Sequence, residues 1–318
     1  MALGLDFEGP AAEIEKKIEE LKNLEAEGEV SFQNEIVKLE EKRDTLLTEI
    51  YSQLTPWQIT QVARHPNRPL FDDYIDLIFT DYVELHGDRN IGDDKAIGAG
   101  FAYLDGEKVF VLGHQKGKNT KSNVERNFGM PNPEGYRKAL RVMEMANKFD
   151  KPIITFIDTP GAFPGLEAEE RGQGEAIAKN LFMMSTFEVP IISIVVGEGG
   201  SGGALALGVA DRMLMLSNSI YSVISPEGCA SILWKDATKA SEAAEALKVT
   251  AKDLLGFNLI DGIVEEPVGG AHRNYELTTN RVKKAILANL KQIKKLSKRK
   301  LVEKRHEKFS KMGNIFNE

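Results

Sequence analysis

Apolar positions in the first eighty residues recur at the spacing of a helix. From Ala11 to Tyr51 the sequence is rich in Glu and Lys, and its apolar residues form one narrow stripe that is broken at Gly28. Such a stripe is typical of a helix that packs one face onto a neighbour, so we expect a helical hairpin. Thr55 followed by Pro56 predicts the start of another helix, and an amphipathic stretch continues through Tyr82. We therefore expect the N-terminal segment to be entirely helical.

Beyond His86 and Gly87 the pattern changes to that of strands. The runs 96–104 and 108–112 are apolar or β-prone, and Asp105-Gly106 between them is a strong hairpin signal. Further strands are expected at 152–157, 190–196, 212–216, 220–224 and 263–264, and helices at 136–145, 167–187 and 202–210, near Cys229, Ala243 and Leu254, and at the basic C-terminal end. Strands that are apolar on both faces and separated by helices predict an α/β fold, with a largely parallel sheet covered on both sides.

Length and cysteine content narrow the class of protein. The chain has 318 residues, a net charge of −7 and one cysteine, Cys229. No apolar run approaches the roughly 18 residues that a membrane span needs, and residues 1–10 lack the pattern of a secretion signal. A single cysteine allows no internal disulfide and no cysteine cluster for zinc. We expect a cytoplasmic protein with no membrane segment and no metal on this chain.

The charge is unevenly distributed, because the C-terminal region is strongly basic. Thirteen basic residues but only two acidic ones lie between Arg281 and Lys311. Such a segment could bind nucleic acid or an acidic partner. However, Val282, Ile286, Leu290, Ile293 and Leu296 recur at helical spacing. This favours a helix docked on the acidic body of the protein over a nucleic-acid-binding tail.

Candidate chemistry is concentrated where three predicted strands end in glycine-rich turns, at 113–117, 158–165 and 197–204. Ligands of α/β folds bind at such strand ends. The third turn matches G-x-G-x-x-G, but no acidic residue follows at the distance that a dinucleotide site needs. It also matches G-x-S-x-G around Ser201, but a serine hydrolase needs a downstream acid and histidine, and only His272 and His306 follow. The first turn is one residue too short between its glycines for a phosphate loop.

The backbone of the third turn offers a different kind of chemistry. Consecutive glycines at the start of a helix leave N–H groups free at the positive end of the helix dipole, where they can stabilise an oxyanion or an enolate. Gly202, Gly203 and Ala204 fit this description. Glycines there could instead serve only tight strand–helix packing. The density of glycine from Gly197 onward favours the functional interpretation.

These turns belong to long stretches that resemble one protein family. GHQKGKNTKSNVERNFGMPNPEGYRKALRVMEMANKFDKPIITFIDTPGAFPGLEAEERGQGEAIAKNL, then VPIISIVVGEGGSGGALALGVADR and YSVISPEGCASILWKD, resemble the alpha subunits of the carboxyltransferase component of bacterial-type acetyl-coenzyme A carboxylase. The match is nearly continuous from about Ser31 to Lys295. It is far more specific than any of the short motifs.

The resemblance implies a fold, an activity and partners. The fold would be crotonase-like, a (ββα)n spiral, with a helical region at 1–85, the carboxyltransferase core at 86–280 and a basic C-terminal helix at 281–318. The activity would be transfer of the carboxyl group from carboxybiotin, held on a biotin carboxyl carrier protein, to acetyl-coenzyme A, giving malonyl-coenzyme A for fatty acid synthesis. The chain would act only with a beta subunit, as an alpha2beta2 heterotetramer with zinc on the beta subunit, and with biotin carboxylase in the larger complex.

The resemblance also implies roles for particular residues. The biotin ureido nitrogen would itself take the proton from the acetyl methyl group, so the protein would supply mainly oxyanion sites and orientation. The N–H groups around Gly202, Gly203 and Ala204 would hold the ureido oxygen. The residues expected to shape the biotin site beside them are Gly161, Ala162, Gly199 and Gly200. We expect Gly203→Val to remove most activity while leaving folding largely intact.

Three lysines form a cationic loop next to the first glycine turn. Lys116, Lys118 and Lys121 suit coenzyme A phosphates or the acidic surface of a carrier protein. A simple solvated loop is an equal alternative.

Two other functions remain open at the level of sequence. The first is a stand-alone crotonase-type hydratase or isomerase of acyl-coenzyme A thioesters, in which Glu198 or Glu167 would be the base. The second is a non-catalytic nucleic-acid-binding protein that acts through its basic C-terminal segment.

Overall fold

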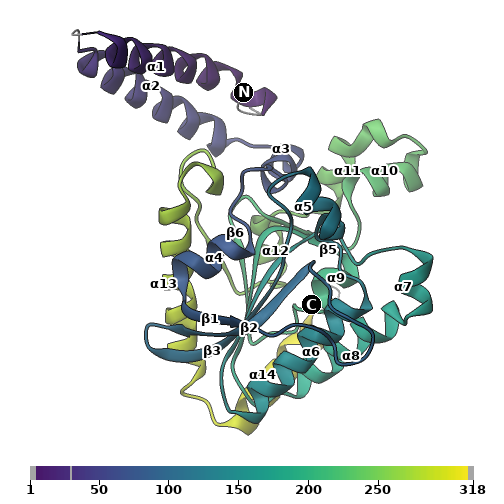
Figure 1. Cartoon of the computed structure of the whole chain (residues 1–318). Helices are drawn as coiled ribbons and strands as arrows, with labels where there is room; N and C mark the ends of the chain where they lie inside the picture. Colours follow the sequence, from purple (N-terminus) through teal and green to yellow (C-terminus); the bar gives the residue numbers. More distant parts are fainter. Residues whose placement is uncertain (1–4, 29–30, 314–318) are drawn as a thin grey trace.

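A twisted mixed sheet runs through the body of the protein (Figure 1). The structure is a computed structural model that describes residues 5–28 and 31–313. Eight strands pair in the order β1-β2-β3-β4-β5-β6-β8, and β7 pairs with β5. The strands are β1 (Thr80–Glu84), β2 (Ile97–Leu104), β3 (Glu107–His114), β4 (Ile153–Thr159), β5 (Ile191–Gly200), β6 (Arg212–Leu216), β7 (Ile220–Ser222) and β8 (Gly262–Val264).

The mode of strand pairing changes once across the sheet. β1, β2 and β3 are antiparallel, and the predicted Asp105-Gly106 turn joins β2 to β3. From β3 onward every pairing is parallel, including that of β7 with the last residues of β5. The carboxyl ends of β3, β4 and β5 therefore lie at one edge of the sheet, and the three glycine-rich turns follow them there.

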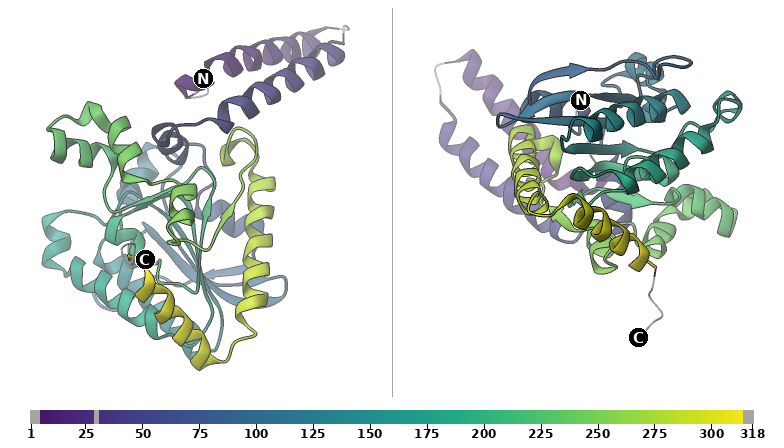
Figure 2. Two further views of the ribbon diagram at one scale, coloured as in Figure 1. Left: turned by 180° about the vertical axis from the view of Figure 1, so that it is seen from behind. Right: turned by 90° about the horizontal axis from the view of Figure 1, so that it is seen from below.

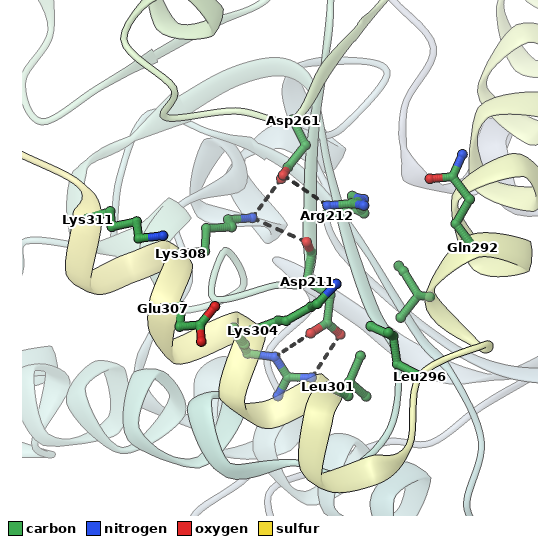
Figure 3. Close-up of a pocket in the computed structure, with 12 residues that line it drawn as sticks. Asp211, Arg212, Asp261, Gln292, Leu296, Leu301, Lys304, Glu307, Lys308 and Lys311 are labelled. Atoms are coloured by element: carbon green, nitrogen blue, oxygen red, sulfur yellow. Dashed lines mark hydrogen bonds and ion pairs between the residues drawn. The ribbon is translucent and has the colours of Figure 1, made fainter.

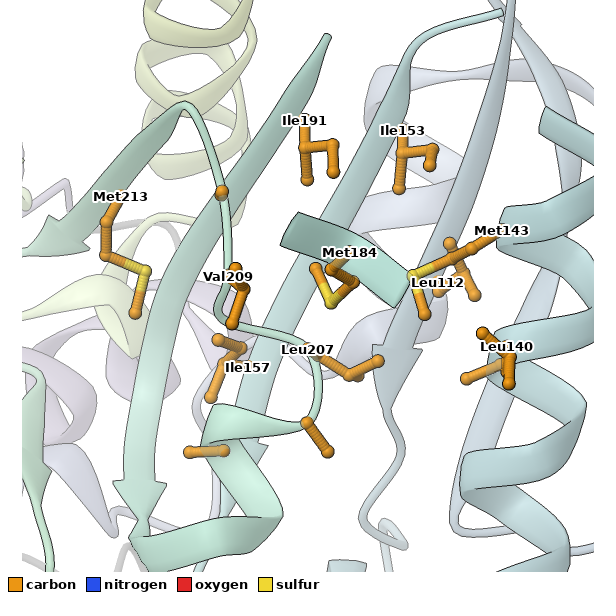
Figure 4. Close-up of a cluster of buried hydrophobic side chains, with 14 of the residues drawn as sticks. Leu112, Leu140, Met143, Ile153, Ile157, Met184, Ile191, Leu207, Val209 and Met213 are labelled. Atoms are coloured by element: carbon orange, nitrogen blue, oxygen red, sulfur yellow. The ribbon is translucent and has the colours of Figure 1, made fainter. Parts of the chain in front are cut away.

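Both faces of the sheet are buried, as the continuous apolar strands predict. Alternate residues along β5 belong to different cores: Ile191 and Val195 face one side, Ile192 and Ile194 the other. On the first side, α6 (Pro133–Lys148) and α8 (Gln173–Thr186) cover the sheet with residues such as Met143 and Met184 (Figure 4). On the second side, the sheet is covered by α4 (Phe71–Ile78) and α13 (Tyr275–Ile293).

The N-terminal hairpin is confirmed and extends away from the sheet (Figures 1 and 2). It consists of α1 (Gly9–Glu27) and α2 (Gln33–Ser52), and a 3₁₀ turn, η1 (Asp6–Glu8), precedes it. The predicted helix start at Thr55 is also confirmed. The Thr55 hydroxyl accepts a hydrogen bond from Gln58 N, and the Gln58 side chain accepts one from Thr55 N, so a capping box begins α3 (Pro56–Ala63).

Several short elements complete the chain. Around the glycine turns lie α5 (Thr120–Glu125), η2 (Asn127–Gly129), α7 (Leu166–Glu170) and α9 (Ser201–Leu205). Beyond β7 lie α10 (Pro226–Trp234), η3 (Ala237–Lys239), α11 (Ala240–Leu247), α12 (Ala251–Gly256), η4 (Ala271–Arg273) and α14 (Lys298–Lys311). In the part of the chain that the structure describes, no helix is both long and apolar enough to cross a membrane.

The expectation that the N-terminal segment is entirely helical is wrong at its end. Helix α4 stops at Ile78, and residues 80–84 form β1, which pairs with β2. The apolar residues of this stretch fit a helix stripe as well as a strand, and the pairing with β2 decides between them.

Three other predicted elements have different lengths from those expected. The helix expected at 167–187 is two helices, because Gly172 adopts a left-handed conformation with φ +82° between α7 and α8. The helix expected at 202–210 ends at Leu205. The strand expected at 220–224 ends at Ser222.

The basic C-terminal helix is also two helices. Helix α13 ends at Ile293 and α14 begins at Lys298, where the side chain of Ser297 accepts a hydrogen bond from Lys300 N. A serine N-cap starts a new helix because it satisfies one of the free N–H groups of the first turn.

Candidate functional site

The turn between β5 and α9 is glycine-rich because side chains would collide there. A Cβ at Gly200 would run into the carbonyl of Pro160, and one at Gly199 would lie 2.6 Å from the ring of Tyr221. A Cβ at Gly203 would lie 2.5 Å from Ala162 N and 2.9 Å from Tyr136 Oη. These close approaches bring the turn at 197–204 against the turn at 158–165. The structure thus places Gly200 and Gly203 beside residues 160–162, whereas Gly199 lies against Tyr221.

The start of α9 contains the other residues predicted to form the oxyanion site. Gly202 and Gly203 follow Ser201 in the first turn of the helix, and Ala204 comes next. The first N–H groups of any helix have no partner within the helix. A Cβ at Gly202 would meet Ile177 at an ordinary 3.7 Å, so Gly202 is not required by packing.

The expectation for Gly203→Val needs correction. The added side chain would press on the backbone of Ala162, which is half-buried against the core, and on Tyr136 Oη, which is fully buried. Overpacking of this kind displaces the backbone. The substitution is therefore expected to disturb the turn itself rather than leave folding largely intact.

The opposing turn is held by a threonine. The Thr159 hydroxyl accepts a hydrogen bond from Gly161 N at 3.0 Å and donates one to Gly161 O at 2.7 Å. Gly161 has φ +149°, a conformation that residues with a side chain rarely adopt. The wall beside α9 is thereby fixed by local bonds within residues 159–161.

Charged groups link the ends of the three strands behind the glycine turns. Asp158 Oδ1 accepts hydrogen bonds from Glu198 N at 2.9 Å and from Lys116 Nζ at 2.6 Å. Arg64, at the end of α3, donates to Glu198 Oε1 from Nε at 2.9 Å and to Glu227 Oε1 from Nη1 at 2.5 Å. Each cation here is paired with a carboxylate, and together the two cations and three carboxylates tie the ends of the strands to one another.

Two buried polar side chains lie next to Gly203 without hydrogen-bond partners among the described residues. They are Tyr136, through its hydroxyl, and His114, through both ring nitrogens. Burial lowers the pKa of His114 to about 4, against an opposing effect of the nearby Asp158 carboxylate. His114 is therefore neutral at pH 7.

A largely apolar cavity of about 460 Å³ opens beside the start of α9. Its walls are formed by Ser201, Gly202, Leu205, Tyr221, Ser222, Val223, Leu247, Leu254 and Leu259. Burial raises the pKa of Tyr221 to about 12, so its hydroxyl is neutral at pH 7. No role for Tyr221 in the site was expected from the sequence. The available signal was an aromatic residue in the short strand expected at 220–224.

The three lysines of the cationic loop are placed in different environments. Lys116 is half-buried against Asp158, and Lys118 pairs with Asp73 at 2.6 Å. Lys121 is exposed on α5. The carboxylate partners neutralise two of the three charges. Lys116 lies closest to the glycine turns, through Asp158.

The basic helix α14 is docked on the body of the protein (Figure 3). The side chain of Arg305 is fully buried and forms a bidentate ion pair with Asp211, with Nε–Oδ1 2.9 Å and Nη2–Oδ2 2.8 Å. Lys308 donates to Asp261 Oδ2 at 2.6 Å. The docking that the apolar spacing predicts is confirmed on α13, whose Val282, Ile286, Leu290 and Ile293 are buried in the second core, and α14 docks through these ion pairs. They line a cavity of about 490 Å³ that does not include the glycine turns.

Cys229 is buried in α10 and has no bond to another sulfur, because it is the single cysteine of the chain. Within residues 5–28 and 31–313, no three His, Cys, Asp or Glu side chains are grouped so that they could hold a metal ion.

The family described as acetyl co-enzyme A carboxylase carboxyltransferase-like matches residues 4–313 of the chain. Among curated relatives, the acetyl-coenzyme A carboxylase carboxyl transferase subunit alpha of Geobacter metallireducens is 59% identical over 98% of both chains. The protein of the same name from Geobacillus thermodenitrificans is 55% identical over 99% of this chain and 97% of its own length.

Solved structures with a similar fold have much lower sequence identity. The transcarboxylase 12S core, solved with methylmalonyl-coenzyme A and methylmalonic acid, aligns with a TM-score of 0.56 at 19% identity over 70% of this chain. The chain spans only 40% of that larger protein. A Pseudomonas malonate decarboxylase hetero-tetramer in complex with coenzyme A aligns with a TM-score of 0.55 at 17% identity, over 64% of this chain and 82% of the other. At such identities the likeness concerns the fold, a mixed sheet covered by helices.

Proposed function

The chain belongs to the family of acetyl-coenzyme A carboxylase carboxyltransferase alpha subunits, and we propose that its two facing glycine turns form the site that holds biotin during carboxyl transfer. The observation that carries this proposal is the close packing of Gly200 and Gly203 on residues 160–162. The activity of the family is that of a carboxyltransferase component. Its alpha subunits work in partnership with a beta subunit.

The residues around the turn fit a biotin group. The glycines let the backbones of the two turns approach without side chains between them, and the apolar cavity that Gly202 lines suits the rings and aliphatic arm of biotin. Carboxybiotin, when bound, supplies the carboxyl group and a ureido nitrogen that can take a proton from the acetyl methyl group.

The chain itself contributes backbone donors and orientation. We assign the N–H groups of Gly202, Gly203 and Ala204 to the ureido oxygen, where negative charge develops. Gly161, Ala162, Gly199 and Gly200 form the wall opposite. Donors that are fixed in place before the reaction need no reorganisation during it, and losing one costs on the order of 3 kcal/mol of barrier.

The remaining parts of the reaction are assigned to other chains. We propose an alpha2beta2 assembly, with the oxyanion site for the thioester enolate and the zinc on the beta subunit. Carboxybiotin is delivered by a carrier protein that biotin carboxylase charges.

The fold is proposed to be of the crotonase type, with residues 86–280 as its core. Pairing of β1 with β2 moves the start of that core to about residue 80. Lys116, Lys118 and Lys121 are proposed contacts for coenzyme A or for the carrier.

A stand-alone hydratase or isomerase is disfavoured by the positions of its candidate bases. The Glu198 side chain is buried and held by Arg64 at 2.6 Å, behind the glycine turns. The Glu167 side chain is 84% exposed on α7, 3.7 Å from Arg171. A general base must lie within reach of the proton that it removes. Neither carboxylate lines the cavity beside α9.

The decisive experiment is the reverse reaction. Malonyl-coenzyme A and a soluble biotin derivative are incubated with this chain alone, with a matching beta chain alone, and with both, and acetyl-coenzyme A is measured. We expect product that depends on the biotin derivative only in the mixture. Absence of biotin-dependent product from the mixture, together with hydration of an enoyl-coenzyme A by this chain alone, would contradict the proposal.

A further inference from the structure

Ser201 has an unusual backbone conformation for its residue type. It adopts φ +51°, in the left-handed region, as the first residue of helix α9 and directly after strand β5. Residues with a Cβ are disfavoured in this region, whereas glycine occupies it freely. Lys235 and Lys248 also adopt it, but as the C-caps of helices, where such a conformation is common. Ser201 occupies no such cap.

The glycines around Ser201 make this choice of residue informative. None of Gly199, Gly200, Gly202 and Gly203 has a positive φ. Packing accounts for three of them, because a Cβ at Gly199, Gly200 or Gly203 would collide with its surroundings. The one position of the run whose backbone conformation favours glycine is the one that carries a side chain. A strained residue that persists at a binding site points to a function for its side chain.

The surroundings of the hydroxyl show where that function acts. Ser201 is exposed, lines the cavity beside α9, and its hydroxyl has no hydrogen-bond partner in the described part of the chain. The opposite walls, Leu247, Leu254 and Leu259, are apolar. Among the described residues that line the cavity there is no Lys or Arg. The side-chain donors of the cavity wall are the hydroxyls of Ser201, Tyr221 and Ser222, and of these Ser201 is the one that belongs to the glycine turn.

We propose that the Ser201 hydroxyl donates a hydrogen bond to the carboxyl group while that group passes between biotin and acetyl-coenzyme A. This inference rests on the proposed function and adds to it a side-chain donor for the transferred group, beside the backbone donors for the ureido oxygen. The hydroxyl keeps its proton throughout. A neutral donor suits this task, because a fixed cation would stabilise the bound carboxylate before transfer more than it stabilises the transition state.

The test uses Ser201→Ala and Ser201→Gly in the enzyme assembled with its beta chain. Ser201→Ala removes the hydroxyl and keeps the Cβ, whereas Ser201→Gly also relieves the left-handed strain. We expect kcat of the reverse reaction to fall about tenfold or more in both variants, the effect of losing one hydrogen bond to a charged group. KM for malonyl-coenzyme A should change little, and the Tm of Ser201→Gly should equal or exceed that of the wild type. Ser241→Ala, an exposed serine on α11, is the matched control.

The outcomes separate this inference from the proposed function. If Ser201→Gly retains kcat within about twofold of the wild type, Ser201 serves only the turn and the inference is overturned. If the wild-type assembly shows no biotin-dependent transfer at all, the proposed function fails and the inference fails with it. Loss of kcat in both variants, with Tm and assembly size unchanged in Ser201→Ala, supports the hydroxyl as a catalytic group.

Discussion

His114 illustrates how a single buried residue can report on the site. It ends β3, its exposed fraction is 1%, and both of its ring nitrogens lack partners among the described residues. A buried polar group without partners destabilises the folded state. His272, which is stacked on His65, also has a lowered pKa, of about 3. Burial is the main cause, and the positive charges of His65 and of nearby arginines lower it further. Both residues couple folding to pH.

The lowered pKa of His114 predicts loss of stability in mild acid. In the unfolded chain a histidine has a pKa of roughly 6.5. In the folded protein the pKa of His114 is about 4, so His114 becomes protonated only at lower pH. The unfolded state therefore binds more protons between these values, and stability falls as the pH is lowered. Lowering the pH from 7 to 5 should therefore reduce the free energy of unfolding by about 2 kcal/mol through His114 alone.

The measurement is urea unfolding of the wild type and of His114→Leu at pH 7 and pH 5. The loss of unfolding free energy between the two pH values should be about 2 kcal/mol smaller in the variant. The contribution of His272 is common to both proteins and cancels in the comparison. Equal losses in the two proteins would show that His114 does not titrate as inferred.

At the scale of single elements, one buried ion pair holds helix α14 against the body of the protein. Arg305 binds Asp211 and also donates to the carbonyl oxygens of Met184, Phe187 and Val189, at 2.6, 2.8 and 3.0 Å. These carbonyls belong to the end of α8 and to the segment before β5. The arginine thus ties the C-terminal helix to the element that precedes the candidate site in the sequence.

We expect Arg305→Ala to destabilise the protein by about 3–5 kcal/mol, because it leaves the Asp211 carboxylate buried without its partner. Arg299→Ala on the same helix is the matched control, since its side chain is 89% exposed. That control should change stability by less than about 0.5 kcal/mol. Unfolding in urea at pH 7 measures both. A similar small effect of the two substitutions would refute the anchoring role of Arg305.

The sequence predicted the elements better than their ends. Strongly patterned strands such as β4 and β5 and the capped helix α3 are where we expected them, because apolar runs and capping residues act locally. The break between α7 and α8 depends on the left-handed conformation of Gly172, and the start of β1 at Thr80 depends on its pairing with β2. At the site, the glycine turns could be identified from the sequence. The collision of a Gly203 Cβ with Ala162 and the cavity wall at Tyr221 required the structure, since both join segments far apart in the chain.

The helical hairpin dominates the shape of the whole molecule, because it extends beyond the body on one side (Figures 1 and 2). Its own core is small: Ile14, Ile18 and Ile36 form its buried cluster, and Ala11 and Leu47 are also buried. Arg273 connects it to the body through ion pairs with Glu8 and Glu15. Two helices with so small a core are only marginally stable by themselves. A hairpin of this kind is expected to gain stability from a further partner.

We therefore predict that the hairpin is an assembly arm of the enzyme. Removing residues 1–52 deletes α1 and α2 but leaves α3, whose capping box lies within residues 55–58, and the whole sheet. The truncated chain should keep the far-ultraviolet circular dichroism of its sheet and remaining helices. Mixed with a beta chain, it should form an assembly of fewer subunits than the full chain does, as measured by light scattering and corrected for the mass of the deleted residues. A second comparison, Leu24→Glu in the full chain, tests the surface alone, because the Leu24 side chain is exposed and packs in no core. An unchanged number of subunits after the deletion would refute the prediction. Fewer subunits both after the deletion and with Leu24→Glu would place a partner against this face of the hairpin.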